Sequence, residues 1–208
     1  MKLYKVLSFI FRPLIALLYP TKIIGRENIP EGKAIVVCNH YSNADAPIMI
    51  TRVFKKGIHY LAKKEIFKGK LKRWFVTKMG AIEIDRENPS AASMKEIFTL
   101  IANDQKIVIF PEGTRNKSGS EKMLPLKYGS SMFSIKTKTP VLPMVFLKKP
   151  KLFRKNYLVI GQPFELTEYY GTKEYVEATA LIESRIYDCR SMVPVKKRKG
   201  KKDANNKV

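Results

Sequence analysis

A histidine and an aspartate five positions apart form the first candidate site in this chain. His40 and Asp45 follow almost directly on the apolar run Ala34–Cys38, which is typical of a buried strand. At this separation the Asp45 carboxylate can turn back to one ring nitrogen of His40. The other ring nitrogen is then free to act as a general base, which typically contributes about 10²- to 10⁴-fold to a rate. The alternative is that Asp45 only caps a helix and His40 is an ordinary loop histidine.

A second polar stretch follows the apolar run 107–110. Gly113 allows close approach of the backbone, Thr114 offers a hydroxyl, and Arg115 presents a planar fork that suits a phosphate. Glu112 is expected to hold a cation or an acceptor hydroxyl. The alternative is an ordinary turn that carries a solvated Glu–Arg pair.

Arg86 ends a third predicted strand and is another candidate for binding phosphate. Ligands of open α/β sheets bind outside the carboxyl ends of the strands. If the strands are parallel, His40, Arg86 and Arg115 are therefore expected at one edge of the sheet. The alternative is that Arg86 pairs with Asp85 or Glu87 at the surface.

The order of predicted elements indicates an α/β fold. Strands alternate with helices along the chain, which favours a single domain with a mixed, largely parallel sheet flanked by helices. A proline, Pro143, places one late strand at an edge or a bulge. Asn88 and Pro89 are expected to cap and open a helix. The predicted strands are 22–25, 34–38, 58–62, 80–86, 106–110, 141–146 and 157–160, and helices are predicted from 46 onward and at 65–79, 88–103 and 172–190.

Composition limits the class of partner. The chain has 208 residues, and 40 Lys and Arg against 18 Asp and Glu give a net charge of +22. This charge favours nucleic acid, anionic lipid, or a phosphorylated or acidic substrate. Two cysteines, Cys38 and Cys189, are too few for a disulfide framework or a zinc site, which fits a reducing compartment. No metal and no cofactor are expected. We expect one domain at 22–190 and a disordered basic tail at 191–208.

Residues 1–21 are predicted to form an amphipathic helix that lies in a membrane interface. The apolar stretch is shorter than the roughly 17–25 residues of a spanning helix, and Arg12 and Pro13 interrupt it. One alternative is a helix packed on the domain's own core. Another is a signal peptide, although no small-residue cleavage site follows Leu18. The predicted apolar face holds Leu7, Ile10, Phe11, Leu14, Leu17 and Leu18, and Lys5, Ser8, Arg12 and Ala16 lie opposite.

Four sequence blocks occur together in a recognisable order and spacing. They are Asn39-His40 with Asp45, then 80–86, then 110–115, then 141–145. In these blocks the chain resembles the glycerolipid acyltransferase family, and within it the bacterial 1-acylglycerol-3-phosphate acyltransferases. The resemblance runs from about residue 25 to residue 170, since 161–166 also resembles a family segment.

The resemblance implies acyl transfer from acyl-CoA or acyl carrier protein to the 2-hydroxyl of lysophosphatidic acid, which gives phosphatidic acid. The enzyme would work at the cytoplasmic face of the membrane, without a metal or a covalent acyl-enzyme. His40 is then the base and Asp45 its partner. Arg86 and Arg115 clamp the acceptor phosphate, and Glu112 with its neighbours Gly113 and Thr114 shapes the acceptor site.

The basic residues after the predicted strand 58–62 have several possible partners, and the sequence does not choose among them. Lys63, Lys64 and the stretch 68–78 are expected to meet the phosphates of the donor, an acidic carrier protein or anionic lipid, or to form only a solvated face. The acceptor could instead be another lysophospholipid or glycerol 3-phosphate. In a different class, the chain could be a non-catalytic basic protein that binds membrane or nucleic acid. Nucleic acid is not expected, because the aromatic residues follow no RNA-binding motif.

Overall fold

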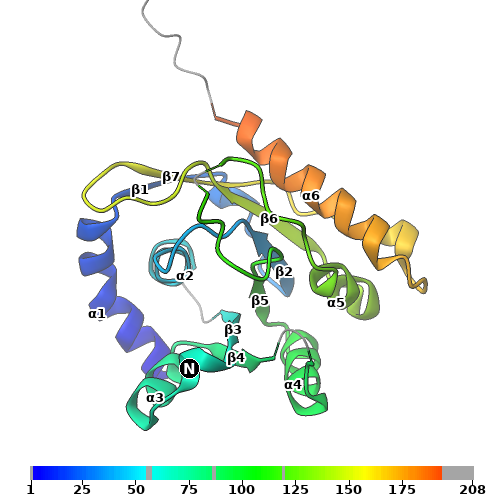
Figure 1. Ribbon diagram of the computed structural model, residues 1–208, viewed down its shortest axis with the longest axis horizontal. Helices are drawn as coiled ribbons and strands as arrows, with labels where there is room; N and C mark the ends of the chain where they lie inside the picture. Colours follow the sequence, from blue (N-terminus) through cyan, green and yellow to red (C-terminus); the bar gives the residue numbers. More distant parts are fainter. Residues whose placement is uncertain (1, 55–57, 86–87, 119, 194–208) are drawn as a thin grey trace, which may run out of the picture.

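The computed structural model describes residues 2–54, 58–85, 88–118 and 120–193. Figure 1 shows a twisted sheet with helices packed on both faces. The seven strands are β1 Thr21–Ile24, β2 Ala34–Cys38, β3 His59–Lys63, β4 Ala81–Ile84, β5 Lys106–Ile109, β6 Val141–Phe146 and β7 Asn156–Ile160. The helices are α1 Lys2–Leu18, α2 Asp45–Ile48, α3 Lys70–Lys78, α4 Ala91–Ala102, α5 Gly129–Thr137 and α6 Tyr175–Ser191, and short helical turns are η1 Arg26–Asn28, η2 Met49–Val53, η3 Lys64–Phe67 and η4 Thr167–Tyr169.

The sheet is largely parallel. Its strand order is β1-β7-β6-β2-β5-β3-β4, and β6 with β7 is the antiparallel pair. The pairs β2 with β5, β5 with β3 and β3 with β4 are all parallel. This confirms the predicted α/β domain with a mixed sheet. The carboxyl ends of β2, β5, β3 and β4 therefore meet at one edge of the sheet, which we call the catalytic edge.

Alternation along the central strand divides the core into two layers. Val36 and Cys38 of β2 pack with α1, α2 and η2 on one face of the sheet. Ile35 and Val37 pack with α4, α5 and α6 on the other face. All five residues of β2 are fully buried, which a parallel strand covered on both faces requires.

The position of β6 excludes the edge predicted for 141–146, while its pairing agrees with the bulge. This strand lies inside the sheet, between β7 and β2, and all six of its residues are buried. Pro143 is tolerated there because its carbonyl points to the β7 side and accepts a hydrogen bond from the Gly161 N–H at 2.9 Å. Pairing with β7 begins only at Met144, opposite Ile160. Past Ile160 the partner chain has one extra residue before Phe164 pairs with Val141, so the N–H that Pro143 lacks falls at a bulge.

Two predicted helices differ in the structure: one begins at another residue, and the other is divided in two. The cap of α4 is Ser90, whose hydroxyl accepts a hydrogen bond from the Ser93 N–H at 3.1 Å, and not Asn88. Ser90 has the extended backbone of an N-cap, and Pro89 stays outside the helix. The predicted helix 65–79 is divided at Gly69, whose φ of 89° interrupts it between η3 and α3.

Helix α1 lies against the domain along one side and is open on the other (Figure 1). Tyr4 is buried and donates a hydrogen bond to the Ile50 carbonyl at 3.3 Å, and Leu7 and Ile15 pack on the same core layer. The predicted apolar face is divided, because half of it packs inward and half, including Leu14 and Leu17, is exposed. Among the described residues, no helix has the length and hydropathy needed to cross a bilayer.

Candidate active site

The structure brings His40 and Asp45 into direct contact. His40 lies two residues past the end of β2, and Asp45 is the first residue of α2. The His40 Nδ1 lies 2.7 Å from Asp45 Oδ2. Because an ionised carboxylate can only accept, Nδ1 carries the hydrogen and Nε2 has the free lone pair that a general base needs.

The Asp45 carboxylate is completely buried and accepts three further hydrogen bonds. Oδ2 accepts from the N–H groups of Tyr41 at 2.7 Å and Ser42 at 2.8 Å, and Oδ1 accepts from the Ser42 hydroxyl at 2.9 Å. A buried charge is expensive unless such donors surround it. The turn between His40 and Asp45 therefore both stabilises the carboxylate and fixes its direction toward the imidazole.

Glu112 links the two polar stretches through backbone groups. Its Oε1 accepts from the His40 N–H at 2.7 Å and its Oε2 from the Leu124 N–H at 2.9 Å. Burial raises the pKa of the Glu112 carboxyl, while the two N–H donors act in the opposite direction. Each oxygen thus accepts one backbone N–H, and the bond to the His40 N–H fixes the backbone at His40. The role of Glu112 toward a cation or an acceptor hydroxyl stays a prediction.

Two more contacts from the segment after β5 hold His40. The Asn116 N–H donates to the His40 carbonyl at 2.7 Å. The imidazole stacks on the Phe110 ring with centroids 4.1 Å apart and an interplanar angle of 20°. The backbone and the ring of His40 are thus both fixed by residues some 70 positions away in the sequence.

Arg115 lies on the same side of the molecule as the turn after His40. Its Nη1 donates to the Asn43 Oδ1 at 2.8 Å. Thr114 is exposed, and Gly113 has a φ of 67°, which glycine adopts without strain. A Cβ on Gly113 would lie 3.1 Å from the Lys127 side chain, so Lys127 lies close above this glycine. Cationic groups therefore meet beside the imidazole loop.

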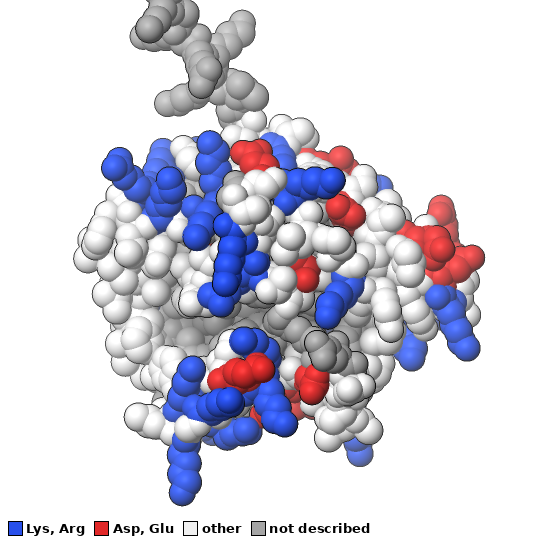
Figure 2. Space-filling view, in the orientation of Figure 1, with Lys and Arg blue, Asp and Glu red and all other residues white. Residues whose placement is uncertain are grey.

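Two of the remaining predicted site residues, Lys63 and Lys64, lie further along the catalytic edge. Lys63 ends β3 and Lys64 begins η3, and both side chains are exposed. Lys63 Nζ is 3.7 Å from a Glu65 carboxylate oxygen. Arg86 lies outside the described residues. Figure 2 shows a hollow near the centre of this face of the molecule, with Lys and Arg side chains on both sides of it.

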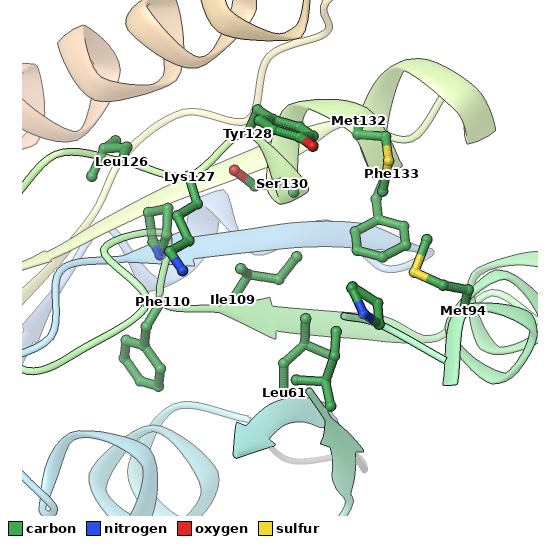
Figure 3. Close-up of a pocket in the computed structure, with 15 residues that line it drawn as sticks. Leu61, Met94, Ile109, Phe110, Leu126, Lys127, Tyr128, Ser130, Met132 and Phe133 are labelled. Atoms are coloured by element: carbon green, nitrogen blue, oxygen red, sulfur yellow. The ribbon is translucent and has the colours of Figure 1, made fainter. Parts of the chain in front are cut away.

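An apolar cavity of about 690 Å³ adjoins the site (Figure 3). It begins at Phe110, the residue stacked on His40, with Lys127 at the same end. Met94 and Phe133 line the other end, and Leu61 lies below in this view. Further lining residues are Ile84, Ile109, Leu126 and Met132. This volume suits a ligand with a substantial apolar part.

The sequence did not single out several residues that hold the site. Asn39 extends the sheet with its side chain, because it donates to the Phe146 carbonyl at 3.0 Å and accepts from the Phe146 N–H at 2.8 Å. Asn43 and Lys127 contact Arg115 and Gly113. Asn39 belongs to the first family block and Asn43 lies three residues after His40, but neither was given a role from the sequence. Lys127 lies in a segment without a helical or strand pattern.

Other titratable groups considered in the sequence lie away from the His40 imidazole or are buried. His59 begins β3, at the opposite end of the sheet from His40, and burial lowers its pKa. Cys38 and Cys189 are buried and unpaired with each other. Burial raises the pKa of Cys189 to about 11 and also holds the pKa of Cys38 well above its usual range. Within the described ranges, no three His, Cys, Asp or Glu side chains form a group that could hold a metal ion.

The comparisons with known proteins agree on one family. Residues 20–147 match the family model described as acyltransferase. A 1-acyl-sn-glycerol-3-phosphate acyltransferase of Bacillus subtilis is 30% identical over 188 residues, which cover 88% of this chain and 92% of that protein. A protein of the same name from Cocos nucifera is 36% identical over 154 residues, which cover 73% of this chain and 48% of the relative.

The fold agrees as well. The crystal structure of the 1-acyl-sn-glycerophosphate acyltransferase PlsC from Thermotoga maritima superposes with a TM-score of 0.66 at 23% identity, and the match covers 92% of this chain and 80% of that one. The family match covers more than half of the chain and includes β2, β5 and β6 together with His40, Asp45 and the segment 111–115. The chain therefore belongs to the acyltransferase family.

Proposed function

We propose that the protein transfers a fatty acyl group from acyl-CoA or acyl carrier protein to the 2-hydroxyl of 1-acylglycerol 3-phosphate. The observation that carries the proposal is the His40–Asp45 pair, whose Nδ1 to Oδ2 distance of 2.7 Å leaves Nε2 as the base. The ring that stacks on His40, Phe110, lines an apolar cavity. The names of the Bacillus and Cocos relatives support this acceptor.

In the proposed reaction, His40 Nε2 takes the proton of the acceptor hydroxyl as its oxygen attacks the thioester carbonyl carbon. The tetrahedral intermediate then collapses, the carbon–sulfur bond breaks, and the leaving thiolate takes the proton from His40. Asp45 stabilises the imidazolium between these two steps. The products are a new ester and a free thiol, so the protein needs no nucleophile of its own.

The cationic groups suit the phosphate of the acceptor. Arg115 offers a planar guanidinium, and its bond to Asn43 fixes the orientation of that group. Arg86 is proposed as the second half of the clamp because it follows β4, whose end lies at the same edge of the sheet. Lys63 and Lys64 are exposed near the end of β3 and would meet the donor or its carrier.

The apolar cavity suits an acyl chain. It runs from Phe110, against the imidazole, toward Met94 and Phe133 between α4 and α5 (Figure 3). An acyl chain in this cavity places its polar end next to His40 and its methyl end between the helices. Burial of the chain there provides binding energy at about 25 cal/mol per Å² of apolar surface.

The exposed apolar half of α1 suits a peripheral position on the cytoplasmic face of a membrane. Such a helix lies in the interface and does not span the bilayer. The acceptor and the product are membrane lipids, so a bound enzyme reaches both. This arrangement differs from nucleic-acid binding, which would not use exposed leucine and phenylalanine side chains.

The test is a product assay on purified variants. The parent chain, His40→Ala and His59→Gln are each incubated with lysophosphatidic acid and either acyl-CoA or acyl carrier protein, and the lipid product is identified by mass spectrometry. The parent and His59→Gln should form phosphatidic acid, and His40→Ala should lose at least about 10²-fold in rate. His59→Gln is the matched control, because His59 is the one other histidine in the sequence.

Parallel reactions with glycerol 3-phosphate and with a choline lysophospholipid test the acceptor. Conversion of either at a higher rate than lysophosphatidic acid would replace the proposed acceptor. Full turnover by His40→Ala would remove His40 as the base. No product from any acceptor, together with salt-sensitive DNA binding, would support the non-catalytic class.

A further inference from the structure

Exposed apolar side chains gather on one side of the molecule. Of the twelve large hydrophobic residues that are exposed in the described part of the chain, nine lie on α1, on α3 or at positions 152 and 153. Single exposed hydrophobic residues are ordinary, but a concentration of this kind marks a binding surface. The nine are Val6, Phe9, Ile10, Leu14 and Leu17 of α1, Leu71 and Trp74 of α3, and Leu152 and Phe153.

These three segments are joined to one another in the fold. Phe11 of α1 and Phe75 of α3 pack edge to face, with ring centroids 5.7 Å apart. At the other end of α1, the Phe153 N–H donates to the Leu18 carbonyl at 2.7 Å. In Figure 1, α3 lies at the lower end of α1, and the connection between β6 and β7 lies at its upper end. The side of the molecule that α1 forms is therefore continuous with both neighbours.

The most exposed of these side chains come from different segments. Phe9 is 78% exposed, Leu71 is 80% exposed and Phe153 is 66% exposed. Phe153 also has a φ of 53°, a left-handed conformation that is costly for a phenylalanine. Its backbone is held by Leu18 while its ring stays in solvent. Folding alone gives no reason to keep an aromatic ring in this position.

The charges on these segments select the partner. The helices α1 and α3 and the segment 148–155 contain no acidic residue. Exposed cations on α3 and after β6 include Lys70, Lys72, Lys151 and Lys155. Figure 2 shows the uncharged area over α1 between two groups of Lys and Arg side chains. Apolar side chains surrounded by cations match the acyl and headgroup layers of an anionic bilayer.

We infer that α1, α3 and residues 151–155 form one membrane-binding surface, which we call the α1–α3 surface, and that its partner is an anionic lipid bilayer. The inference extends the proposed peripheral role of α1 and rests on the proposed lipid acceptor. It assigns the basic helix α3 to lipid, and not to the acyl donor or its carrier protein. Leu71 and Trp74 insert beside α1, and Leu152 and Phe153 insert at its other end.

Trp74 provides a direct test because it is the one tryptophan in the sequence. The fluorescence of the full chain is recorded with phosphatidylcholine vesicles that contain or lack phosphatidylglycerol, with and without brominated acyl chains. On phosphatidylglycerol vesicles the emission should shift to shorter wavelength, and brominated chains should quench it. The shift should weaken with added salt and on pure phosphatidylcholine.

Matched variants test the two outer segments. Leu71→Ser and Phe153→Ser should each weaken partition onto anionic vesicles about threefold to tenfold, measured by co-sedimentation. Val176→Ser on α6 is the control, because Val176 is 70% exposed but lies outside the α1–α3 surface. Thermal unfolding of all three should match the parent, since these side chains are in solvent.

Two results would overturn the inference. One is co-sedimentation of the parent without quenching of Trp74, which would leave α1 as the binding element. The other is a change in Trp74 emission with acyl carrier protein but not with vesicles, which would make α3 a protein-binding site. Neither measurement uses a substrate, and both can be repeated on His40→Ala. A failure here is thus separate from a failure of acyl transfer, which can be assayed with detergent-solubilised acceptor.

Discussion

Charged side chains are usually exposed and large apolar side chains usually buried, and the catalytic edge and the α1–α3 surface depart from this rule in opposite ways. At the catalytic edge, Asp45 and Glu112 are buried carboxylates. On the α1–α3 surface, Phe9 and Leu71 are large hydrophobic residues in solvent. Each arrangement costs stability when judged by folding alone. In the proposed function the first arrangement positions a base, and in the inferred membrane contact the second meets lipid.

The two regions also differ in how they are held. Asp45 accepts four hydrogen bonds within six residues of sequence, and Glu112 ties His40 to the segment after β5 across 72 positions. The α1–α3 surface is joined by a ring contact and a backbone hydrogen bond. Substitutions at the catalytic edge should therefore change both stability and rate, whereas substitutions on the exposed surface should change only lipid binding.

The largest effect is expected at Asp45. Asp45→Asn replaces an acceptor oxygen by an NH₂ group that faces N–H donors, and it no longer holds the His40 tautomer. We expect kcat to fall about 10³-fold. Steady-state kinetics check this, with Asp188→Asn on the exposed side of α6 as the control. If Asp45→Asn keeps more than a tenth of the parent activity, Asp45 does not assist His40 in the reaction.

Glu112→Gln should reduce stability as well as rate. Glutamine can accept from one of the two N–H groups, so either His40 or Leu124 loses its partner. An unsatisfied buried donor costs about 1 to 3 kcal/mol, and a displaced His40 should lower kcat about tenfold. Chemical denaturation and kinetics measure the two effects. A fall in stability with normal kcat would show that Glu112 does not position the base.

The stability difference between the parent and Glu112→Gln should change with pH in one direction. Burial raises the folded-state pKa of Glu112 above the value of about 4.3 in an unfolded chain, so protonation favours the folded state. The stability of the parent relative to Glu112→Gln should decrease as pH rises from about 4 to the raised pKa, and stay constant above it. An increase over this range would contradict the burial of the charge.

Arg115→Lys should affect acceptor binding more than chemistry. Lysine keeps the charge but loses the planar fork and the bond to Asn43. We expect the KM for lysophosphatidic acid to rise about tenfold, with kcat within about threefold of the parent. Arg185→Lys on α6 provides the control. An unchanged KM would remove Arg115 from the phosphate clamp.

The smallest effect, and the sharpest contrast with the catalytic edge, is expected on α1. Leu17→Ser should change the free energy of unfolding by no more than about 0.5 kcal/mol, because Leu17 is exposed. Activity on acceptor in vesicles should still fall a few-fold, while activity in detergent stays the same. Ile15→Ser, on the half-buried side of the same helix, should destabilise the fold instead. Equal behaviour of the two variants would show that both faces of α1 pack on the domain.

Much of the fold could be predicted from local patterns. Short apolar runs between turn residues predicted β2 and β5 within a residue, because strands buried on both faces need continuous apolar sequence. The position of β6 could not be predicted in this way. Its central place depends on antiparallel pairing with β7, and on the fact that the N–H missing from Pro143 falls beyond that pairing.

The same distinction between local and long-range contacts applies to the candidate site. The His40–Asp45 contact spans five residues, so sequence spacing allowed it, and the four family blocks favoured it over a simple helix cap. The two hydrogen bonds that Glu112 accepts from backbone N–H groups depend on how the segment after β5 folds back. The same is true of the approach of Lys127 to Gly113. The roles of Arg86, Arg115, Lys63 and Lys64 in binding substrate stay predictions, as does the lipid contact of α1.

The burial of the two cysteines has a consequence for the proposed reaction, in which the acyl donor is a thioester. A thiolate attacks a thioester far more readily than a hydroxyl does, so a reactive cysteine near His40 would divert the acyl group onto the protein. Cys38 lies two residues before His40, yet it is enclosed in the sheet and its pKa is raised by burial. In the proposed reaction this burial keeps the protein's own thiols away from the activated donor. We therefore expect a thiol reagent added to the native protein to detect the thiol released in each turnover and not the two cysteines.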